Sequence, residues 1–393
     1  MPASNSDRTK RGNSFKRVLA YMMKLCKDLG YISNYEKDYK IGMPGYTDQN
    51  QFKAPYRIEF SDYTEWIVFT TTSLRERIKE QYWDSFNLKQ LNQQITRAYL
   101  VYPDSLDDSD RRLFEYKNTK IQNNGEFSSL DALVSQDGLF NRIEAYAIRT
   151  LTPNQQRDVK GNNFEKRVAA TLKNPCNLDK WKTQDSMLEG LHYNLFTEIV
   201  DTFGLVPDHI TSIDSTSDKT IIGLLPSGGP AKTDVLTTVT YDDGHVEYYT
   251  ISCKRSSSTS VSVHQYSADS FANVLDANNT ELRRVLNAFQ TCGNKRDMLE
   301  SDIQILETEI QPHILALCQW AIAGIGGEGN PDTQWANYIL VYDNNSESFT
   351  VHPSLSYCNR LANDCTRTFN TPFSWTYQGT RGTNIQLKCP LDL

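Results

Sequence analysis

Three residues that could share one chemical site stand at opposite ends of a short segment, 230–257, which reads PAKTDVLTTVTYDDGHVEYYTISCKRSS. Asp234 precedes a first apolar run, and Ser252 and Lys254 end a second one. A carboxylate, a hydroxyl and an ammonium group together suit the binding of a hard metal ion and the orientation of a water molecule. Whether the three side chains meet depends on the turn between the two runs.

The turn is predicted at the Asp-Asp-Gly sequence at 242–244, because β-branched and aromatic residues stand on both sides of it. A two-residue turn would set Asp234 opposite Cys253 and place Ser252 and Lys254 on the other face. A three-residue loop with its Gly in the left-handed conformation sets Asp234 opposite Ser252 instead. Lys254 then shares their face, because strand side chains repeat every two residues.

The composition of the faces favours the three-residue loop. It leaves a second face that suits a core, formed by Val235, Thr237, Val239, Tyr241, Tyr249, Ile251 and Cys253. Directly opposite Cβ atoms lie about 5 Å apart, so Asp234, Ser252 and the Lys254 amine converge. We expect Asp234 to hold Mg²⁺, the backbone carbonyl of Cys253 to be a further ligand, and Lys254 to orient or help deprotonate the attacking water in phosphodiester hydrolysis. The alternative is an ordinary hairpin with a salt-bridged surface lysine.

Three stretches, in this order, resemble the core of the PD-(D/E)XK nucleases and, in their details, the MspI-type restriction endonucleases. They are SGGPAKTDV at 227–235, ISCKRSSSTSVSVHQYS at 251–267 and PFSWTYQGTRGTNIQLKCP at 372–390. The resemblance implies an α/β fold, a mixed sheet flanked by helices, with roughly residues 155–393 as the catalytic part.

The same resemblance places Asp234, Ser252 and Lys254 on the catalytic positions and implies Mg²⁺ as cofactor. Most nucleases of this class carry Glu or Asp where this chain has Ser252, but MspI-type enzymes also lack an acid there. The departure therefore fits the subgroup and leaves open whether Ser252 is a direct metal ligand. Glu165 is either an auxiliary acid near the metal site or an exposed helical residue.

Candidate DNA contacts fall into two groups. In the resembled family a terminal Gln-x-Lys hairpin contacts bases, which points to Gln386 and Lys388, with Thr376 and Gln378 across from them. Gln can pair bidentately with adenine, and Lys can read the acceptors of guanine in the major groove. The second group follows the metal site along the chain and comprises Arg255, Ser256, Ser257 and His264.

Composition limits the alternatives. A length of 393 residues allows two domains, expected at 1–150 and 151–393. The formal net charge of −7 disfavours a non-specific binder that relies on phosphate attraction, but a sequence-specific enzyme can concentrate positive charge locally. No apolar run reaches the length of a membrane span, and the first residues lack the apolar core of a signal peptide, so we expect a soluble, cytoplasmic protein.

Four short similarities recur in the same order and suggest an internal duplication. Gly-Asn-x-Phe helix starts at 12–15 and 161–164, P-x-x-T-D elements ending at Asp48 and Asp234, apolar hairpin runs, and the strings AYLVYP and NYILVYD make up the set. Where the second copy has Ser-Cys-Lys, the first offers three threonines at 70–72 and no aligned Lys, and Asp48 is expected at a strand start, facing Thr70 or Thr72 across the hairpin. The N-terminal domain is therefore predicted to be a degenerate nuclease repeat that assists DNA binding or supports the active half.

Other motifs receive structural interpretations. Residues 185–204 and 302–324 carry apolar side chains at helical spacing, the latter interrupted near Pro312. The Gly-rich string GIGGEGN at 324–330 lacks the Lys-Ser/Thr of a phosphate loop and is interpreted as a flexible connection. The eight cysteines have no zinc-template spacing and are expected to be reduced and mostly buried.

These expectations describe a type II restriction endonuclease that hydrolyses duplex DNA at a short specific sequence and leaves 5′-phosphates. A repair or nicking endonuclease of the same fold, and a catalytically silent DNA-binding module, are the alternatives. The first reading also implies a cognate DNA methyltransferase in the same system, without a stable complex.

Overall fold

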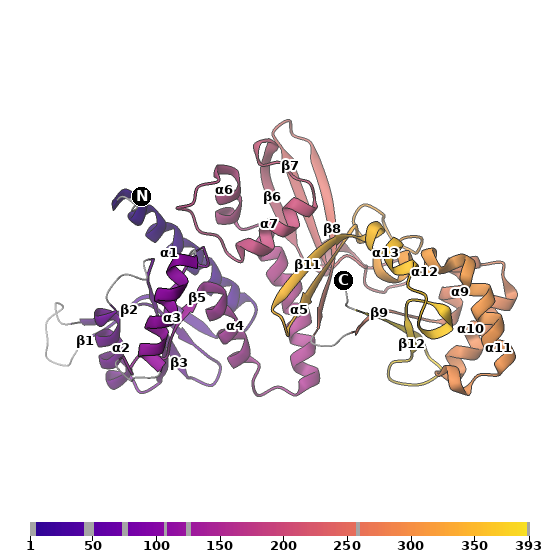
Figure 1. The fold of residues 1–393 in the computed structure, drawn as a ribbon, viewed down its shortest axis with the longest axis horizontal. Coiled ribbons are helices and arrows are strands. Elements are labelled where there is room, and N and C mark those ends of the chain that lie inside the picture. Colours follow the sequence, from indigo (N-terminus) through magenta and orange to yellow (C-terminus); the bar gives the residue numbers. More distant parts are fainter. Residues whose placement is uncertain are drawn as a thin grey trace. The chain divides into compact units, whose positions relative to one another are not determined.

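The computed structural model describes residues 5–42, 51–72, 78–105, 108–122, 127–256 and 260–390. The chain forms two compact units (Figure 1). Unit 1 comprises Met1–Gln156 and Asn174–Tyr193, and unit 2 comprises Arg157–Lys173 and Asn194–Leu393. The two units differ from the predicted domains 1–150 and 151–393. Residues 174–193 return to unit 1 after the chain has entered unit 2.

Unit 1 is built on a five-stranded sheet in the order β1-β2-β3-β4-β5, in which β1–β2 and β2–β3 are antiparallel and β3–β4 and β4–β5 are parallel. Its elements are α1 (Asn5–Asp28), β1 (Asn34–Gly42), β2 (Gln51–Glu59), β3 (Glu65–Thr70), α2 (Lys79–Leu91), β4 (Ile95–Tyr102), α3 (Asp108–Gln122), β5 (Ala132–Ser135), α4 (Gln136–Ala147) and α6 (Pro175–Thr183). Helix α5 (Pro153–Leu172) carries the chain into unit 2.

The strands of unit 1 pair in a register that corrects one sequence expectation. Val68 lies opposite Tyr56 on β2, and on the other side Thr70 pairs with Val101 of β4. Continued by two steps, the β2–β3 register sets Ala54 opposite Thr70, so the expected pairing of Asp48 with Thr70 or Thr72 does not fit this hairpin. Asp48 itself lies outside the described residues.

Unit 2 contains a second five-stranded sheet, in the order β11-β10-β8-β7-β6, and a three-stranded sheet, β12-β13-β9. Its elements after α5 are α7 (Tyr193–Thr202), η2 (Pro207–His209), β6 (Ile210–Thr216), α8 (Lys219–Ile222), β7 (Val235–Tyr241), β8 (Val246–Ser256), β9 (Ser260–Tyr266), α9 (Ala268–Asp276), α10 (Thr280–Cys292), η3 (Lys295–Asp297), α11 (Glu300–Ile310), η4 (Gln311–His313), α12 (Ile314–Ala323), β10 (Tyr338–Asp343), β11 (Ser348–Pro353), α13 (Ser354–Ala362), η5 (Thr368–Asn370), β12 (Ser374–Thr376) and β13 (Ile385–Pro390).

The hairpin β7–β8 has the three-residue loop. The Tyr241 amide donates to the His245 carbonyl at 2.9 Å, and Gly244 adopts a positive φ of 84° that an L residue rarely takes. The ladder ends at Val235 opposite Ile251, both fully buried, so the next step sets Asp234 opposite Ser252. The predicted register is confirmed.

Helices α5 and α7 cover the larger sheet of unit 2 on the buried face of the β7–β8 hairpin. Phe164 of α5 packs on Tyr342, and Phe203, just after α7, stacks on Tyr249 at a ring distance of 4.5 Å. Between β8 and its parallel neighbour β10 the chain forms β9 and α9 to α12, and Figure 1 shows α9, α10 and α11 grouped together near β12. These helices bury their apolar faces with β9, β12 and β13 in one core cluster.

The three-stranded sheet contains a β-bulge. Leu387 of β13 pairs with His264, but its neighbour Lys388 pairs with Ser262, so Val263 is an extra residue on β9. The Val263 carbonyl accepts a hydrogen bond from the Lys232 ammonium at 2.6 Å. The bulge changes which side chains of β9 face outward, because every residue after it is shifted by one position relative to the strand alternation.

The predicted helices are partly corrected. Only Tyr193–Thr202 of the segment 185–204 is helical, and the residues before it form turns, one of them closed by the Asp185 side chain on the Met187 amide. The interruption near Pro312 is confirmed by η4 between α11 and α12. Gly12 and Gly161 lie inside α1 and α5 rather than at their starts. No described helix is both long and apolar enough to cross a membrane.

Candidate active site

Asp234, Ser252 and the backbone of Cys253 form one hydrogen-bonded cluster at the end of the β7–β8 ladder. The Cys253 amide donates to Asp234 Oδ2 at 2.8 Å, and the Ser252 hydroxyl lies 3.3 Å from the same oxygen. Because the ladder ends before this point, the carboxylate takes the place of a strand partner for the Cys253 amide. The Asp234 side chain is thereby held in a fixed orientation while remaining 16% exposed.

Lys254 completes the cluster that the sequence predicted. Its ammonium donates to Ser252 Oγ at 2.8 Å and to the Cys253 carbonyl at 3.1 Å, and it lies 3.5 Å from Asp234 Oδ2. Ser252 is fully buried, so its hydroxyl serves to position the lysine and the carboxylate rather than to face solvent. The Cys253 carbonyl, expected as a metal ligand, is close enough to the site for that role but accepts from Lys254 here.

A second carboxylate and a second lysine join the site from elements distant in sequence. Glu165 of α5 lies 3.1 Å, through its Oε2, from the ammonium of Lys219 at the start of α8. The same ammonium lies 3.4 Å from Asp234 Oδ1. Glu165 is therefore at the site, which the sequence left open. Lys219 was missed, because no motif or spacing relates it to Asp234.

The charges of this cluster interact strongly. Burial raises the pKa of Glu165, and the nearby negative charge of Asp234 raises it further. Burial alone would lower the pKa of Lys219, but the charges of Asp234 and Glu165 outweigh it, so the pKa is raised. The Cys253 thiol points to the buried face of the hairpin, where burial raises its pKa well above the usual value. The site is thus a pair of carboxylates with an ammonium group near each oxygen of Asp234.

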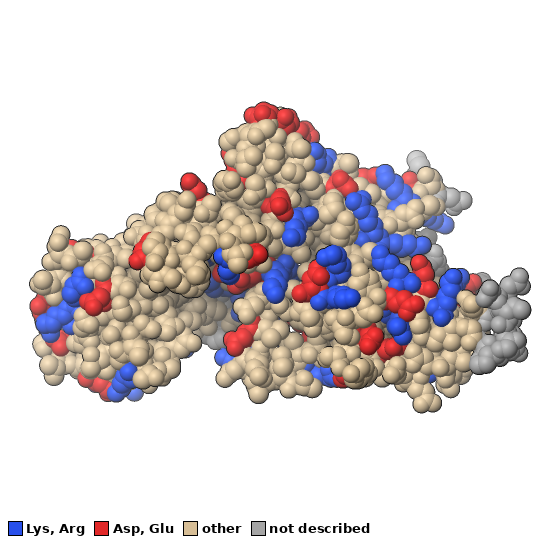
Figure 2. All heavy atoms as spheres, turned by 180° about the vertical axis from the view of Figure 1, so that it is seen from behind, with Lys and Arg blue, Asp and Glu red and all other residues tan. Residues whose placement is uncertain are grey.

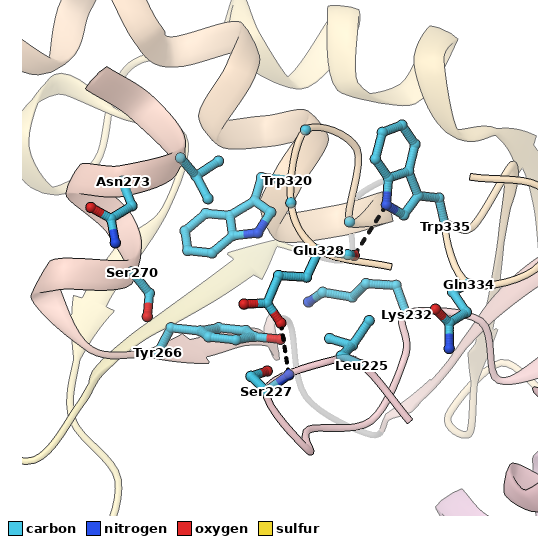
Figure 3. A pocket seen from close by; sticks show the side chains of 14 residues that line it. Leu225, Ser227, Lys232, Tyr266, Ser270, Asn273, Trp320, Glu328, Gln334 and Trp335 are labelled. Carbon is cyan, nitrogen blue, oxygen red and sulfur yellow. Dashed lines mark hydrogen bonds between the residues drawn. The ribbon is translucent and has the colours of Figure 1, made fainter. Parts of the chain in front are cut away.

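Lys232 holds in place the segment that precedes Asp234. Its ammonium is buried and donates to the carbonyls of Val263 and Ala321, tying the segment before Asp234 to β9 and α12. Burial, together with the charge of Lys254, lowers the pKa of Lys232 to about 7. Lys232 also lines a cavity of about 350 Å³ whose walls include Tyr266 and Trp320 (Figure 3).

The Gly-rich string at 324–330 is a packed wall of this cavity rather than a flexible connection. A Cβ at Gly327 would lie 2.5 Å from the indole nitrogen of Trp320, so only glycine permits this approach. The loop carries Glu328, whose carboxylate accepts from the Ser227 amide at 3.0 Å, while its backbone carbonyl accepts from the Trp335 indole (Figure 3). The loop therefore fixes the position of the segment that leads into Asp234.

The outer face of the three-stranded sheet carries the predicted terminal residues. Thr376 lies opposite Gln386, which is only 6% exposed and whose amide donates to Gln378 Oε1 at 3.0 Å. Lys388 is exposed on the same face as Gln386, two residues along β13. We define this surface as the recognition face; its members on the three strands and the adjoining turn are Ser262, Gln265, Ser374, Thr376, Gln378, Gln386 and Lys388.

His264 is not on the recognition face, which corrects the sequence prediction of a DNA contact. The bulge at Val263 turns its side chain to the core, where it is 3% exposed and its ring lies 3.9 Å from that of Trp320. Gln265 takes the outward position beside Gln386. A bulge leaves no plain signature in the alternation of strand residues, so the sequence does not show this inward orientation of His264.

The residues that follow Lys254 differ in their surroundings. The Arg255 guanidinium donates to Asn344 Oδ1 at 2.7 Å and lies over the ring of Tyr342, which anchors it within unit 2. The Ser256 carbonyl accepts from the Asn344 amide at 2.8 Å, and Ser257 lies outside the described residues. Figure 2 shows basic and acidic side chains intermixed over much of the face drawn, in keeping with a net charge of −7.

The residues present fit a hard divalent cation. Asp234 and Glu165 offer carboxylate oxygens on either side of one ammonium position, and the Cys253 carbonyl is adjacent. Mg²⁺ is typically bound by one or two carboxylates, with water and substrate phosphate completing the shell. In the described part of the chain no group of three or more His, Cys, Asp and Glu side chains could hold a metal ion. The eight cysteines, all in described segments, are free thiols.

The chain is similar to known proteins in its sequence and in its fold. Residues 142–389 match the family described as restriction endonuclease MspI. The chain is 24% identical to the type II restriction enzyme BsuFI of Bacillus subtilis, over 99% of each protein. Its fold is similar to the crystal structure of restriction endonuclease MspI in complex with its cognate DNA, with a TM-score of 0.53 and 18% identity, covering 64% of this chain and 98% of that one.

Proposed function

Because the chain belongs to the MspI family of restriction endonucleases, we propose that it is a Mg²⁺-dependent type II enzyme of the PD-(D/E)XK class. It cuts duplex DNA at a short specific sequence and leaves 5′-phosphate ends. The observation that carries the proposal is the convergence of Asp234, Glu165 and Lys254 on one site at the end of the β7–β8 ladder.

Each residue has a role that follows from its contacts. Asp234 and Glu165 would hold the metal ion, which would supply polarisation of the scissile phosphate and stabilisation of the leaving oxygen. Lys254, held by the Ser252 hydroxyl, orients the attacking water toward the phosphorus atom and takes part in removing its proton. Ser252 is a positioning residue, because it is buried and acts through Lys254.

Sequence specificity is assigned to the recognition face. Gln386 and Gln265 lie side by side on β13 and β9, and Lys388 stands exposed on the same face. Amide and ammonium groups of this kind can read base edges in the major groove. Because β9 follows β8 along the chain, the strand that carries Lys254 leads directly into a strand of the recognition face.

Unit 1 is proposed to be a degenerate copy of the nuclease fold that supports the catalytic unit or its DNA. The support is the shared order of elements: one long helix, three antiparallel strands, and then a strand parallel to the third. The match to the MspI family begins at residue 142, whereas the similarity to BsuFI spans 99% of the chain, so one relative shares the N-terminal region and the family core does not include it.

Digestion of a sequenced plasmid with Mg²⁺, followed by mapping of the ends, tests the proposal. Discrete fragments with 5′-phosphates at one short sequence are the expected result. Nicks that depend on a lesion would identify a repair enzyme, and specific binding without cleavage would identify a silent DNA-binding module. We further propose a cytoplasmic location and a cognate DNA methyltransferase encoded in the same system, since an enzyme that cuts a short site needs its host DNA protected.

A further inference from the structure

Lys219 lies where a cation between Asp234 and Glu165 would lie. Its ammonium is 3.1 Å from Glu165 Oε2 and 3.4 Å from Asp234 Oδ1, and it thus joins the two carboxylates that the proposed function assigns to the metal. Lys254 contacts the other oxygen of Asp234, Oδ2. The two lysines therefore occupy different positions, and Lys219 is the one whose ammonium contacts both carboxylates.

The two lysines also differ in how they are held. The Lys254 ammonium donates hydrogen bonds to Ser252 Oγ and the Cys253 carbonyl, and its side chain is 21% exposed. The Lys219 side chain is 41% exposed. Lys219 begins the four-residue helix α8, whose backbone is fixed by the Asp218 side chain at one end. A long flexible side chain on a fixed backbone can swing into solvent without any change in fold.

The charges explain why such a movement is needed. Asp234 and Glu165 carry two negative charges, and Lys219 and Lys254 two positive ones, so the four groups together are neutral. A divalent ion added to this set meets no net attraction unless Lys219 leaves or a DNA phosphate arrives. Because charges close together in a partly buried site interact strongly, the ammonium and the ion exclude each other from the position between the carboxylates.

We propose, on the basis of the proposed function, that Lys219 is an internal cation that competes with the metal ion in the DNA-free enzyme. It leaves the carboxylates when the ion and a DNA phosphate enter together, and its ammonium then pairs with that phosphate. Metal binding is thereby coupled to DNA binding. Coupling of this kind is reciprocal, so the metal ion must tighten DNA binding by the same factor by which DNA tightens metal binding.

The test is a calorimetric titration of the full-length protein with Ca²⁺, a hard cation that uses the same kinds of ligand, in the absence and presence of cognate duplex. Lys219→Ala is expected to tighten Ca²⁺ binding without DNA by about tenfold or more, since one competing charge is removed. The gain in affinity on adding duplex should shrink in the same variant. Lys219→Arg should keep the weak DNA-free binding of the wild type.

Lys166→Ala is the matched control, because Lys166 neighbours Glu165 on α5 and its side chain is exposed. It removes the same charge and should leave Ca²⁺ affinity unchanged. Equal or weaker Ca²⁺ binding by Lys219→Ala, with binding still abolished by Asp234→Asn, would overturn the competition while leaving the nuclease proposal intact. Ca²⁺ binding that survives Asp234→Asn would overturn both, because the ion would then lie elsewhere.

Discussion

The two five-stranded sheets of this chain share the directions of their first four strands, differ in the direction of the fifth, and place different side chains at one corresponding position. In unit 1 the strand pair β3–β4 aligns Thr70 with Val101, and in unit 2 the pair β8–β10 aligns Lys254 with Val341. The Leu-Val-Tyr strings at 100–102 and 340–342 bring the two registers into correspondence. Thr70 of unit 1 therefore corresponds to Lys254 of unit 2. The sequence comparison instead sets Lys254 against position 72, two residues later.

The same correspondence extends to the other members of the site. Val68 occupies the position of Ser252, and its partner Tyr56 occupies that of Asp234. Both Val68 and Tyr56 are buried, so unit 1 has an apolar and an aromatic side chain at the positions that correspond to Ser252 and Asp234. Gathering charges in a partly buried site carries a desolvation cost that apolar packing avoids. Similar strand registers in the two units thus carry different side chains at corresponding positions.

The strongest test of this contrast substitutes corresponding positions in the two units. Lys254→Ala should lower the cleavage rate by about 10²–10⁴-fold, as expected for loss of a group that handles a proton. Asp234→Ala should lower it further, because the metal ion loses a ligand fixed by the Cys253 amide. Rates are measured on plasmid DNA with Mg²⁺, and specific binding is checked with Ca²⁺.

Thr70→Ala is the control in unit 1 and should cut at the wild-type rate. Asp48→Ala should also leave cleavage intact. Loss of cleavage in either variant, with the fold preserved, would mean that unit 1 contains a working site and would contradict the proposed difference between the two units.

A second test asks whether residues of the recognition face contact bases or contribute only to non-specific DNA binding. Gln386→Ala or Lys388→Ala should weaken binding to the cognate duplex by about 1–3 kcal/mol, the usual cost of a lost base contact. Binding to random-sequence duplex should change little, as measured by fluorescence anisotropy at one salt concentration. Equal losses on both duplexes would show that these residues touch phosphate or maintain the fold.

Ser252→Ala should have a smaller effect on catalysis than loss of Lys254 itself. Removing a hydrogen bond to a charged group costs about 1.5 kcal/mol, close to tenfold in rate. Single-turnover kinetics should show this loss in the chemical step. Ser215→Ala is a matched control, because Ser215 is buried in β6 of the same sheet and bonds Thr237 instead of a site residue. A loss as large as that of Lys254→Ala would make Ser252 a direct participant.

The smallest expected effect concerns the inner face of the recognition sheet. Burial lowers the pKa of His264 well below its usual value, so the folded protein binds fewer protons than the unfolded chain as the pH falls below about 6.5. Stability is therefore lost toward acid pH, by about 1.4 kcal/mol at one pH unit below the unfolded pKa. His264→Phe should remove this dependence in denaturant unfolding at pH 5.5 and 8.

His209→Phe provides the control, because His209 is exposed beside the β7–β8 loop. It should leave the acid sensitivity unchanged. The same His264→Phe variant should bind cognate DNA as the wild type does, since His264 faces the core. A specific loss of DNA affinity would return His264 to the set of DNA contacts.

What could be predicted from the sequence was local. The Asp-Asp-Gly turn fixed the register that unites Asp234 with Ser252 and Lys254, and Pro312 marked the break between α11 and α12. Such signals depend on the conformational preferences of a few adjacent residues. They hold wherever neighbouring elements do not override them.

What could not be predicted depends on contacts between distant segments. Lys219 reaches the site only because α8 packs near the start of β7, and no periodicity relates it to Asp234. The bulge at Val263 is stabilised by Lys232, thirty-one positions away along the chain. The glycines at 324–330 predict a flexible loop, because its packing partners, Trp320 among them, cannot be recognised from the glycines themselves.

The bulge on β9 has a consequence for how this protein can tolerate insertions and deletions. In the β7–β8 hairpin the loss or gain of one residue would exchange the core face with the face that carries Asp234 and Lys254, so this segment should vary only by substitution. The β9 strand already accommodates one surplus residue at Val263, whose carbonyl has a partner off the ladder. Among descendants of this enzyme, single-residue length changes should therefore accumulate in β9, where they shift Gln265 relative to Gln386 and alter the sequence that is read while the chemistry is preserved.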